Sequence, residues 1–249
     1  AAQNISPEIS LDGTYTLYVR CRDANGNVNE DEYAIRFCVE KGPDTTPPVI
    51  EGTSISNGMP VSFNTNDTDL EVYVNEPATC KWSHLDKSYK DMENNMTCPE
   101  KVTEINAQML YACTTILNGL KSETENRFYF RCKDQPCING MTCKINESDR
   151  NINAESYKFS LLGTRSLIIS KVMPNDTVKD STEAVKVTLE AETREGYKDG
   201  EAICEYSDTG RENSYIQFYN TNSYTHSQDL WLPEGSYIYY IKCIDLGGN

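Results

Sequence analysis

Ten cysteines are the residues of this 249-residue chain that are best suited to chemistry. Cysteines form disulfides in oxidising compartments or bind metals as thiolates, and the two uses differ in spacing. The chain has only two histidines, His84 and His226, and no C-x₂-C pair. Cys132, Cys137 and Cys143 are close in sequence, but no histidine lies near them. The even count therefore favours disulfides over a zinc or iron–sulfur site.

Candidate catalytic residues are few. The stretch Trp82–Asp86 contains Ser, His and Asp, the residue types of a hydrolase triad. Adjacent positions on a strand point to opposite faces, so these three cannot form a triad among themselves. No phosphate-binding glycine loop and no H-E-x-x-H sequence occurs. We expect no catalytic residue, no cofactor and no enzyme.

The charge balance bears on partners. Asp and Glu number 38 against 23 Lys and Arg, which gives a formal net charge of −15. Such a surface repels phosphate backbones, so we expect no nucleic-acid partner. No apolar run reaches the ~18 residues of a membrane span, so none is expected in this segment.

A repeated string indicates the elements that position the cysteines. "GTYTLYVRC" (Gly13–Cys21) aligns without a gap with "GSYIYYIKC" (Gly235–Cys243). A third copy, "FYFRCKD", lies at Phe128–Asp134. Alternate residues of each copy share the parity of its cysteine, which predicts a strand with one buried face.

The outer copies continue into Asp-x-x-Gly-Asn turns at Asp23–Asn27 and Asp245–Asn249, whereas the middle copy carries an inserted loop at 135–151. Glycine adopts positive φ at no steric cost, and the Asp side chain accepts hydrogen bonds from the turn. We therefore interpret these residues as turn formers. A Ca²⁺ site is the alternative, although the twelve-residue calcium loop is absent.

A second cysteine-bearing element recurs upstream. "PATCKWS" (Pro77–Ser83) matches "EAICEYS" (Glu201–Ser207), and each follows an alternating apolar segment, Leu70–Glu76 or Val185–Glu192. Many short strands separated by turn signals predict an all-β chain of tandem, disulfide-stapled sandwiches.

Unit boundaries follow from the connections. Lys41–Ile50 contains three prolines and predicts a stiff, extended linker, and Leu161–Ile169 is the corresponding junction before the third unit. We expect the end of one domain at 1–43, a complete domain at 44–162 and a third at 163–249. The third should lack its last strand, which the same chain or another would supply.

The alignment assigns most cysteines. Equivalent positions predict one disulfide in each of units two and three, and the remaining predicted pairs lie in the variable middle of unit two and in its inserted loop. The predicted pairs are Cys80–Cys132, Cys204–Cys243, Cys98–Cys113 and Cys137–Cys143. Cys21 and Cys38 stay unassigned, because the hairpin register makes a bond between them strained.

Two tryptophans and five asparagines are further residues whose surroundings the sequence predicts. We expect Trp82 and Trp231 to lie in the core, with exposed sugar-binding platforms as the alternative. Asn-x-Ser/Thr sequences mark possible N-glycosylation sites at Asn4, Asn66, Asn95, Asn146 and Asn175.

"DTTPPVI" (Asp44–Ile50) and the Asp-x-x-Gly-Asn turns resemble the tandem prokaryotic Ig-like domains of large cell-surface proteins, in a cysteine-containing variant. The resemblance implies a non-enzymatic segment of an extracellular stalk, filament, adhesin or surface-layer protein. Its partners would be copies of itself or neighbouring domains. The alternative is a glycan- or protein-binding module that uses the middle of unit two and the 135–151 loop, possibly accessory to a secreted enzyme.

Overall fold

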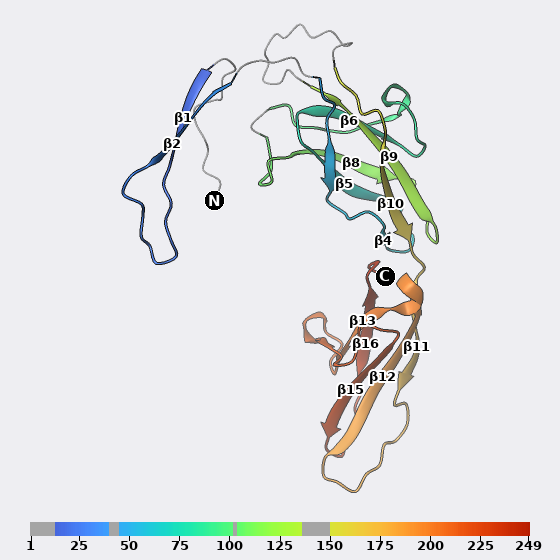
Figure 1. The fold of residues 1–249 in the computed structure, drawn as a ribbon. Helices are drawn as coiled ribbons and strands as arrows, with labels where there is room; N and C mark the ends of the chain where they lie inside the picture. Colours follow the sequence, from blue (N-terminus) through green and yellow to red (C-terminus); the bar gives the residue numbers. More distant parts are fainter. Residues whose placement is uncertain (1–12, 40–44, 102–103, 136–149) are drawn as a thin grey trace.

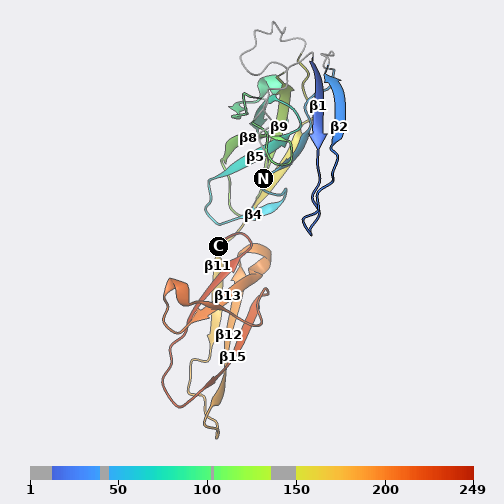
Figure 2. The ribbon, with the colours of Figure 1, turned by 90° about the vertical axis from the view of Figure 1, so that its left-hand side faces the viewer.

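The structure is a computed structural model that describes residues 13–39, 45–101, 104–135 and 150–249. In these ranges the strands form five sheets, which make one hairpin and two sandwiches (Figure 1). The two sandwiches, called units two and three, lie end to end in both views (Figures 1 and 2). The described 3₁₀ turns are η1 (Tyr89–Asp91), η3 (Tyr197–Gly200) and η4 (Glu212–Ser214). None of the described residues belongs to a helix long and apolar enough to cross a membrane.

The first copy of the repeat forms an antiparallel hairpin of β1 (Gly13–Val19) and β2 (Tyr33–Val39). Its apolar residues Leu17, Ile35 and Phe37 are exposed, because no described strand faces them. The buried face predicted for this copy is therefore not buried in the described residues.

Unit two consists of two sheets that follow the predicted segments. One sheet has the order β3–β5–β8, with β3 (Ile50–Thr53), β5 (Asp67–Val74) and β8 (Tyr111–Asn118). The other has the order β4–β10–β9–β6–β7, with β4 (Met59–Val61), β10 (Tyr157–Gly163), β9 (Glu125–Asp134), β6 (Ala78–Ser83) and β7 (Asn94–Asn95).

This strand order is that of an immunoglobulin-like sandwich. Strands β3, β5 and β8 form one sheet, while β6, β9 and β10 belong to the other. The last strand, β10, lies beside β9. β10 runs antiparallel to β9 and parallel to β4, so a short strand near the start of unit two pairs with its last strand. The predicted all-β, disulfide-stapled, Ig-like class is confirmed.

The core of unit two follows the two-residue period of its strands. Val72 on β5, Trp82 on β6, Phe130 on β9 and Phe159 on β10 are all at most 1% exposed. Val72, Phe130 and Phe159 alternate with more exposed residues, as expected where one strand face meets the opposite sheet. Trp82 also donates from Nε1 to Thr115 Oγ1 at 2.9 Å, which satisfies its buried N–H.

Unit three also has two sheets, of order β11–β12–β15 and β14–β13–β16, and the second has three strands in the described residues where that of unit two has five. Their bounds are β11 (Leu167–Met173), β12 (Val185–Glu195), β15 (Thr225–Leu232), β14 (Ile216–Gln217), β13 (Ala202–Ser207) and β16 (Tyr240–Asp245). Leu189, Cys204 and Phe218 are buried between the sheets, and half-buried Tyr206 and Ile241 pack around them. In the described residues β16 pairs only with β13.

Trp231 corrects one expectation, because its side chain is 63% exposed. Leu230 packs on the core of unit three, so the next residue on β15 points to the other face. There Trp231 lies opposite Lys186, whose Nζ is 6.0 Å from the indole ring centre. Trp82, by contrast, lies in the core as expected.

Candidate functional site

An aspartate and an asparagine form a similar hydrogen-bonded pair at or just after the end of each of the three strands β1, β9 and β16. In the hairpin, Asn27 donates from its backbone N to Asp23 Oδ1 at 2.9 Å and from Nδ2 to Asp23 Oδ2 at 2.8 Å. The backbone N of Asp23 donates in return to the Asn27 carbonyl at 3.0 Å. The Asn27 side-chain and backbone hydrogen bonds hold the pKa of Asp23 below its ordinary value. Gly26 completes the turn with a φ of +92°.

Unit two keeps this pair across its inserted loop. Asn151 donates to Asp134 Oδ2 from the backbone N at 2.9 Å and from Nδ2 at 2.8 Å, and Asp134 N donates to the Asn151 carbonyl at 3.0 Å. Asp134 is buried, with its Oδ1 3.9 Å from Arg150 Nε. The hydrogen bonds that end the strand are thus independent of how many residues intervene.

In unit three the pair reaches across to unit two. Asn249 donates from its backbone N to Asp245 Oδ1 at 2.9 Å, and Tyr197 N donates to Asp245 Oδ2 at 2.6 Å. The side-chain oxygen of Asn249 accepts from the Phe63 backbone N at 2.6 Å, and its Nδ2 donates to Thr164 Oγ1 at 2.8 Å. One amide therefore joins the last described turn of unit three to the connection and to unit two.

Thr164 is the centre of this junction. It is 4% exposed, and its backbone N and hydroxyl both bond to the Val61 carbonyl, the hydroxyl at 2.7 Å. Beside it, a Cβ on Gly163 would lie 2.0 Å from the Lys121 carbonyl, so only glycine fits. The exposed pair Arg165–Glu123, at 2.9 Å, adds little in water. The connection between the units therefore contains one buried residue, Thr164, which is hydrogen-bonded to both units, and it is not a loose tether.

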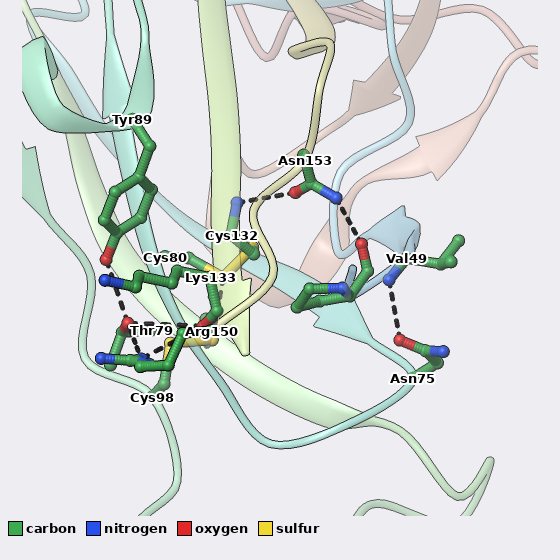
Figure 3. Close-up of a disulfide and its surroundings, with 12 residues drawn as sticks. Val49, Asn75, Thr79, Cys80, Tyr89, Cys98, Cys132, Lys133, Arg150 and Asn153 are labelled. Atoms are coloured by element: carbon green, nitrogen blue, oxygen red, sulfur yellow. Dashed lines mark hydrogen bonds between the residues drawn. A yellow bond between two sulfur atoms is a disulfide. The ribbon is translucent and has the colours of Figure 1, made fainter. Parts of the chain in front are cut away.

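The proline-bearing linker is also fastened to unit two. Asn153 accepts from Cys132 N at 2.7 Å, as Figure 3 shows. Its Nδ2 donates to the Pro48 carbonyl. Asn75 Oδ1 accepts from Val49 N at 2.8 Å. Pro48 itself is buried. These asparagines hold the last linker residues against the sandwich.

The cysteines lie where the repeat alignment puts them. Cys80 faces Cys132 across β6 and β9, and Cys204 faces Cys243 across β13 and β16, so both bonds staple neighbouring strands of one sheet. Figure 3 shows the first of these bonds. The third disulfide of the described residues is Cys98–Cys113. Cys137 and Cys143 lie outside the described residues.

Cys21 and Cys38 belong to different ends of the hairpin. Cys38 is opposite Thr14 in the ladder, while Cys21 lies beyond the Val19–Tyr33 end and donates its N–H to Asn29 Oδ1. The register thus separates them, as expected. Cys204, Cys243 and His226 come together in unit three, but both sulfurs are bonded to each other and are not thiolates.

The Ser-His-Asp stretch does not assemble. Ser83 donates its hydroxyl to the Leu85 carbonyl, while the His84 ring packs against Trp82 at 5.3 Å between ring centres. Asp86 turns to Ser156, whose hydroxyl donates at 2.7 Å and lowers the pKa of that carboxyl.

Three of the five sequon asparagines are within the described ranges. Asn66, Asn95 and Asn175 are exposed, whereas Asn4 and Asn146 lie outside the described residues. Their glycosylation stays a prediction.

No family model and no curated protein matches the sequence. Among solved structures, domains A168–A170 of titin are similar at 9% identity and a TM-score of 0.40, covering 98% of this chain and 91% of that one. The titin I-band fragment I67–I69 is similar at 14% identity and a TM-score of 0.29, covering 93% and 69%. A teleost fish polymeric Ig receptor ectodomain is similar at 9% identity and a TM-score of 0.22, covering 74% and 94%. The fold assignment therefore rests on strand order and register.

Proposed function

We propose that this chain is a non-enzymatic spacer segment of an extracellular stalk, filament, adhesin or surface-layer protein, built from tandem prokaryotic-type Ig-like domains. The observation that carries the proposal is the Asn249 amide, which bonds to Thr164 and to the Phe63 backbone at once. A spacer has to transmit force and keep its length. Hydrogen bonds across a junction limit bending, because each of them contributes about 0.5–1.5 kcal/mol that a bent arrangement would lose.

The linker and the staples support the same role. Asn153 and Asn75 hold the proline segment at the other end of unit two. Disulfides suit an oxidising, extracellular location. In this proposal copies of the chain or adjoining domains are the partners.

The test is the interunit flexibility of a Thr164→Val variant. Valine keeps the shape but loses the hydroxyl that bonds Val61 and Asn249. Small-angle X-ray scattering should show a broader distribution of end-to-end distances than in the wild type. Thr114→Val, an exposed position on β8 whose hydrogen bonds go to Thr97 and not to the junction, is the control and should leave the distribution unchanged. Equal flexibility in all three proteins would refute a stiff spacer.

A glycan-binding module is the second candidate, favoured by the exposed Trp231 beside Lys186. Aromatic faces stack on sugars, and a neighbouring amine can donate to hydroxyls. Quenching of the fluorescence of this indole by oligosaccharides, lost in Trp231→Ala, would support this function. Binding that survives the substitution would move the site elsewhere.

A further inference from the structure

Two disulfides meet in the core of unit two. Cys80–Cys132 belongs to the sheet of β6 and β9, while Cys113 lies on β8 of the opposite sheet. The Sγ atoms of Cys113 and Cys80 are only 3.6 Å apart. The Sγ atoms of Cys80, Cys98 and Cys113 all lie within 4.8 Å of one another. Figure 3 shows Cys98 beside the Cys80–Cys132 bond.

The sulfurs differ in their access to solvent. Cys113 and Cys132 are 0% exposed and Cys80 is 2% exposed, whereas Cys98 is half-buried in the segment after β7. A thiolate from solution can therefore attack the pair Cys98–Cys113 only at Cys98. Attack at that sulfur makes Cys113 the leaving group, because disulfide exchange expels the sulfur opposite the new bond.

We propose that unit two contains a relay of disulfide exchange from Cys98–Cys113 to Cys80–Cys132, started by a small-molecule thiol. The thiolate attacks Cys98 Sγ, forms a mixed disulfide with it and releases the Cys113 thiolate. Cys113 then attacks Cys80 Sγ, which forms Cys80–Cys113 and releases Cys132 as a thiolate. A second thiol reduces the mixed disulfide at Cys98 and leaves as the oxidised thiol dimer, so the protein takes up two electrons.

The product differs mechanically from the starting state. Cys80–Cys113 joins the two sheets of the sandwich across its core, whereas Cys80–Cys132 joins neighbours in one sheet. The segment that carries Cys98 loses its covalent bond to β8 and keeps the Thr97–Thr114 hydrogen bonds. A reducing surrounding thus converts an in-sheet staple into a staple between sheets without unfolding the unit.

Unit three provides an internal contrast. Its disulfide Cys204–Cys243 has His226 rather than a second disulfide beside it. No relay is therefore available there, and its bond should respond to thiols by simple reduction.

The first experiment uses Cys98→Ser in the full chain, which leaves the Cys113 thiol permanently beside Cys80. After incubation at mildly alkaline pH, acid quenching, denaturation and alkylation, peptide mapping should find both Cys80–Cys132 and Cys80–Cys113. Alkylated Cys132 is the diagnostic product. The matched variant Cys113→Ser leaves the half-buried Cys98 thiol instead and should retain Cys80–Cys132 with no alkylated Cys132. Retention of Cys80–Cys132 alone in Cys98→Ser would overturn the proposal.

The wild type gives a second measurement that needs no variant to fold. Limited treatment with glutathione, followed by the same mapping, should yield Cys80–Cys113 together with alkylated Cys98 and Cys132. Release of Cys98 and Cys113 together, with Cys80–Cys132 intact, would show simple reduction and refute the relay. The fraction of Cys204–Cys243 reduced in the same sample calibrates the strength of the treatment.

Discussion

Units two and three share a strand order but differ in what they bury. The core of unit two holds Trp82, Phe128, Phe130 and Phe159, all at most 1% exposed. Unit three has one buried aromatic ring in its core cluster, that of Phe218. Closely similar strand patterns thus produce a full core in one unit and a lean core in the other.

Part of this difference in core size comes from the strand that pairs with the one carrying the second cysteine, Cys132 in unit two. In unit two Phe159 and Leu161 come from β10, which covers the outer side of β9. In the described residues of unit three β16 has no such neighbour, and Ile241 and Cys243 stay half-buried. The closing strand of this fold therefore contributes core volume as well as ladder hydrogen bonds.

Removing a disulfide should produce the largest difference in stability between the two units. Replacing both Cys204 and Cys243 by alanine should lower the free energy of unfolding of unit three by about 4 kcal/mol, from the entropy of its 39-residue loop. With its lean core, unit three should then unfold and lose amide protection in hydrogen-exchange mass spectrometry. The same change at Cys80 and Cys132 should weaken unit two but leave it folded. Equal protection in both units would contradict the comparison.

Truncating a core aromatic side chain should destabilise unit two more than unit three, the reverse of the effect expected for the disulfides. Phe130→Ala should destabilise unit two by about 3–4 kcal/mol, because the tightly packed site cannot collapse around the lost ring. Phe218→Ala should cost unit three less, since half-buried Tyr206 and Leu230 can move into the space. Guanidinium unfolding, followed by hydrogen exchange in each unit, measures both. A larger loss for Phe218→Ala would show that unit three depends on that ring as much as unit two does on its full set.

Acid should affect unit three through His226, by a smaller amount. This side chain is 2% exposed, with Nε2 2.9 Å from Thr193 Oγ1 and Nδ1 2.8 Å from Thr221 Oγ1. Thr193 donates its hydroxyl to the Gly200 carbonyl, so Nε2 must carry the proton and donate to it. Burial lowers the pKa of His226 from its ordinary 6.5.

The sign of the pH effect follows from that lowering. Above pH 6.5 the imidazole is neutral in both the folded and the unfolded chain, and its contribution to stability is complete. As the pH falls below 6.5 the unfolded chain binds the proton first, so unit three should become less stable until the lower folded-state pKa is passed. Thermal unfolding at pH 7.5 and 5.5 measures this, and His226→Gln should remove the difference between the two values. An unchanged difference in that variant would assign it to other groups.

Much of the sandwich could be predicted from the sequence because a two-residue period directly reports a buried strand face. Cys80 and Trp82 are two positions apart on one strand, so both point into the core, and the alignment of Cys204 with Cys80 predicts the disulfide of unit three. The expectation for Trp231 is wrong because the burial of Leu230 decides which face of β15 is inside, and Trp231 points to the other face.

Contacts between separate layers could not be predicted in this way. The hydrogen bond from Phe63 to Asn249 joins residues 186 positions apart and depends on how two units dock. The approach of Cys113 to Cys80 depends on the spacing between two sheets, which no strand pattern specifies. The periodicity of a strand predicts which of its residues share a face of the sheet. The distances between residues across the core depend on how the two sheets pack.

The Asp134–Asn151 pair has a consequence for how this fold accommodates new sequence. It makes the same hydrogen bonds over 17 positions that Asp23 and Asn27 make over four. Because closing a longer loop costs only about 0.6 kcal/mol per doubling of its length, this position can accept foreign peptides or whole domains. The inserted sequence can change there while the strands on either side keep their register.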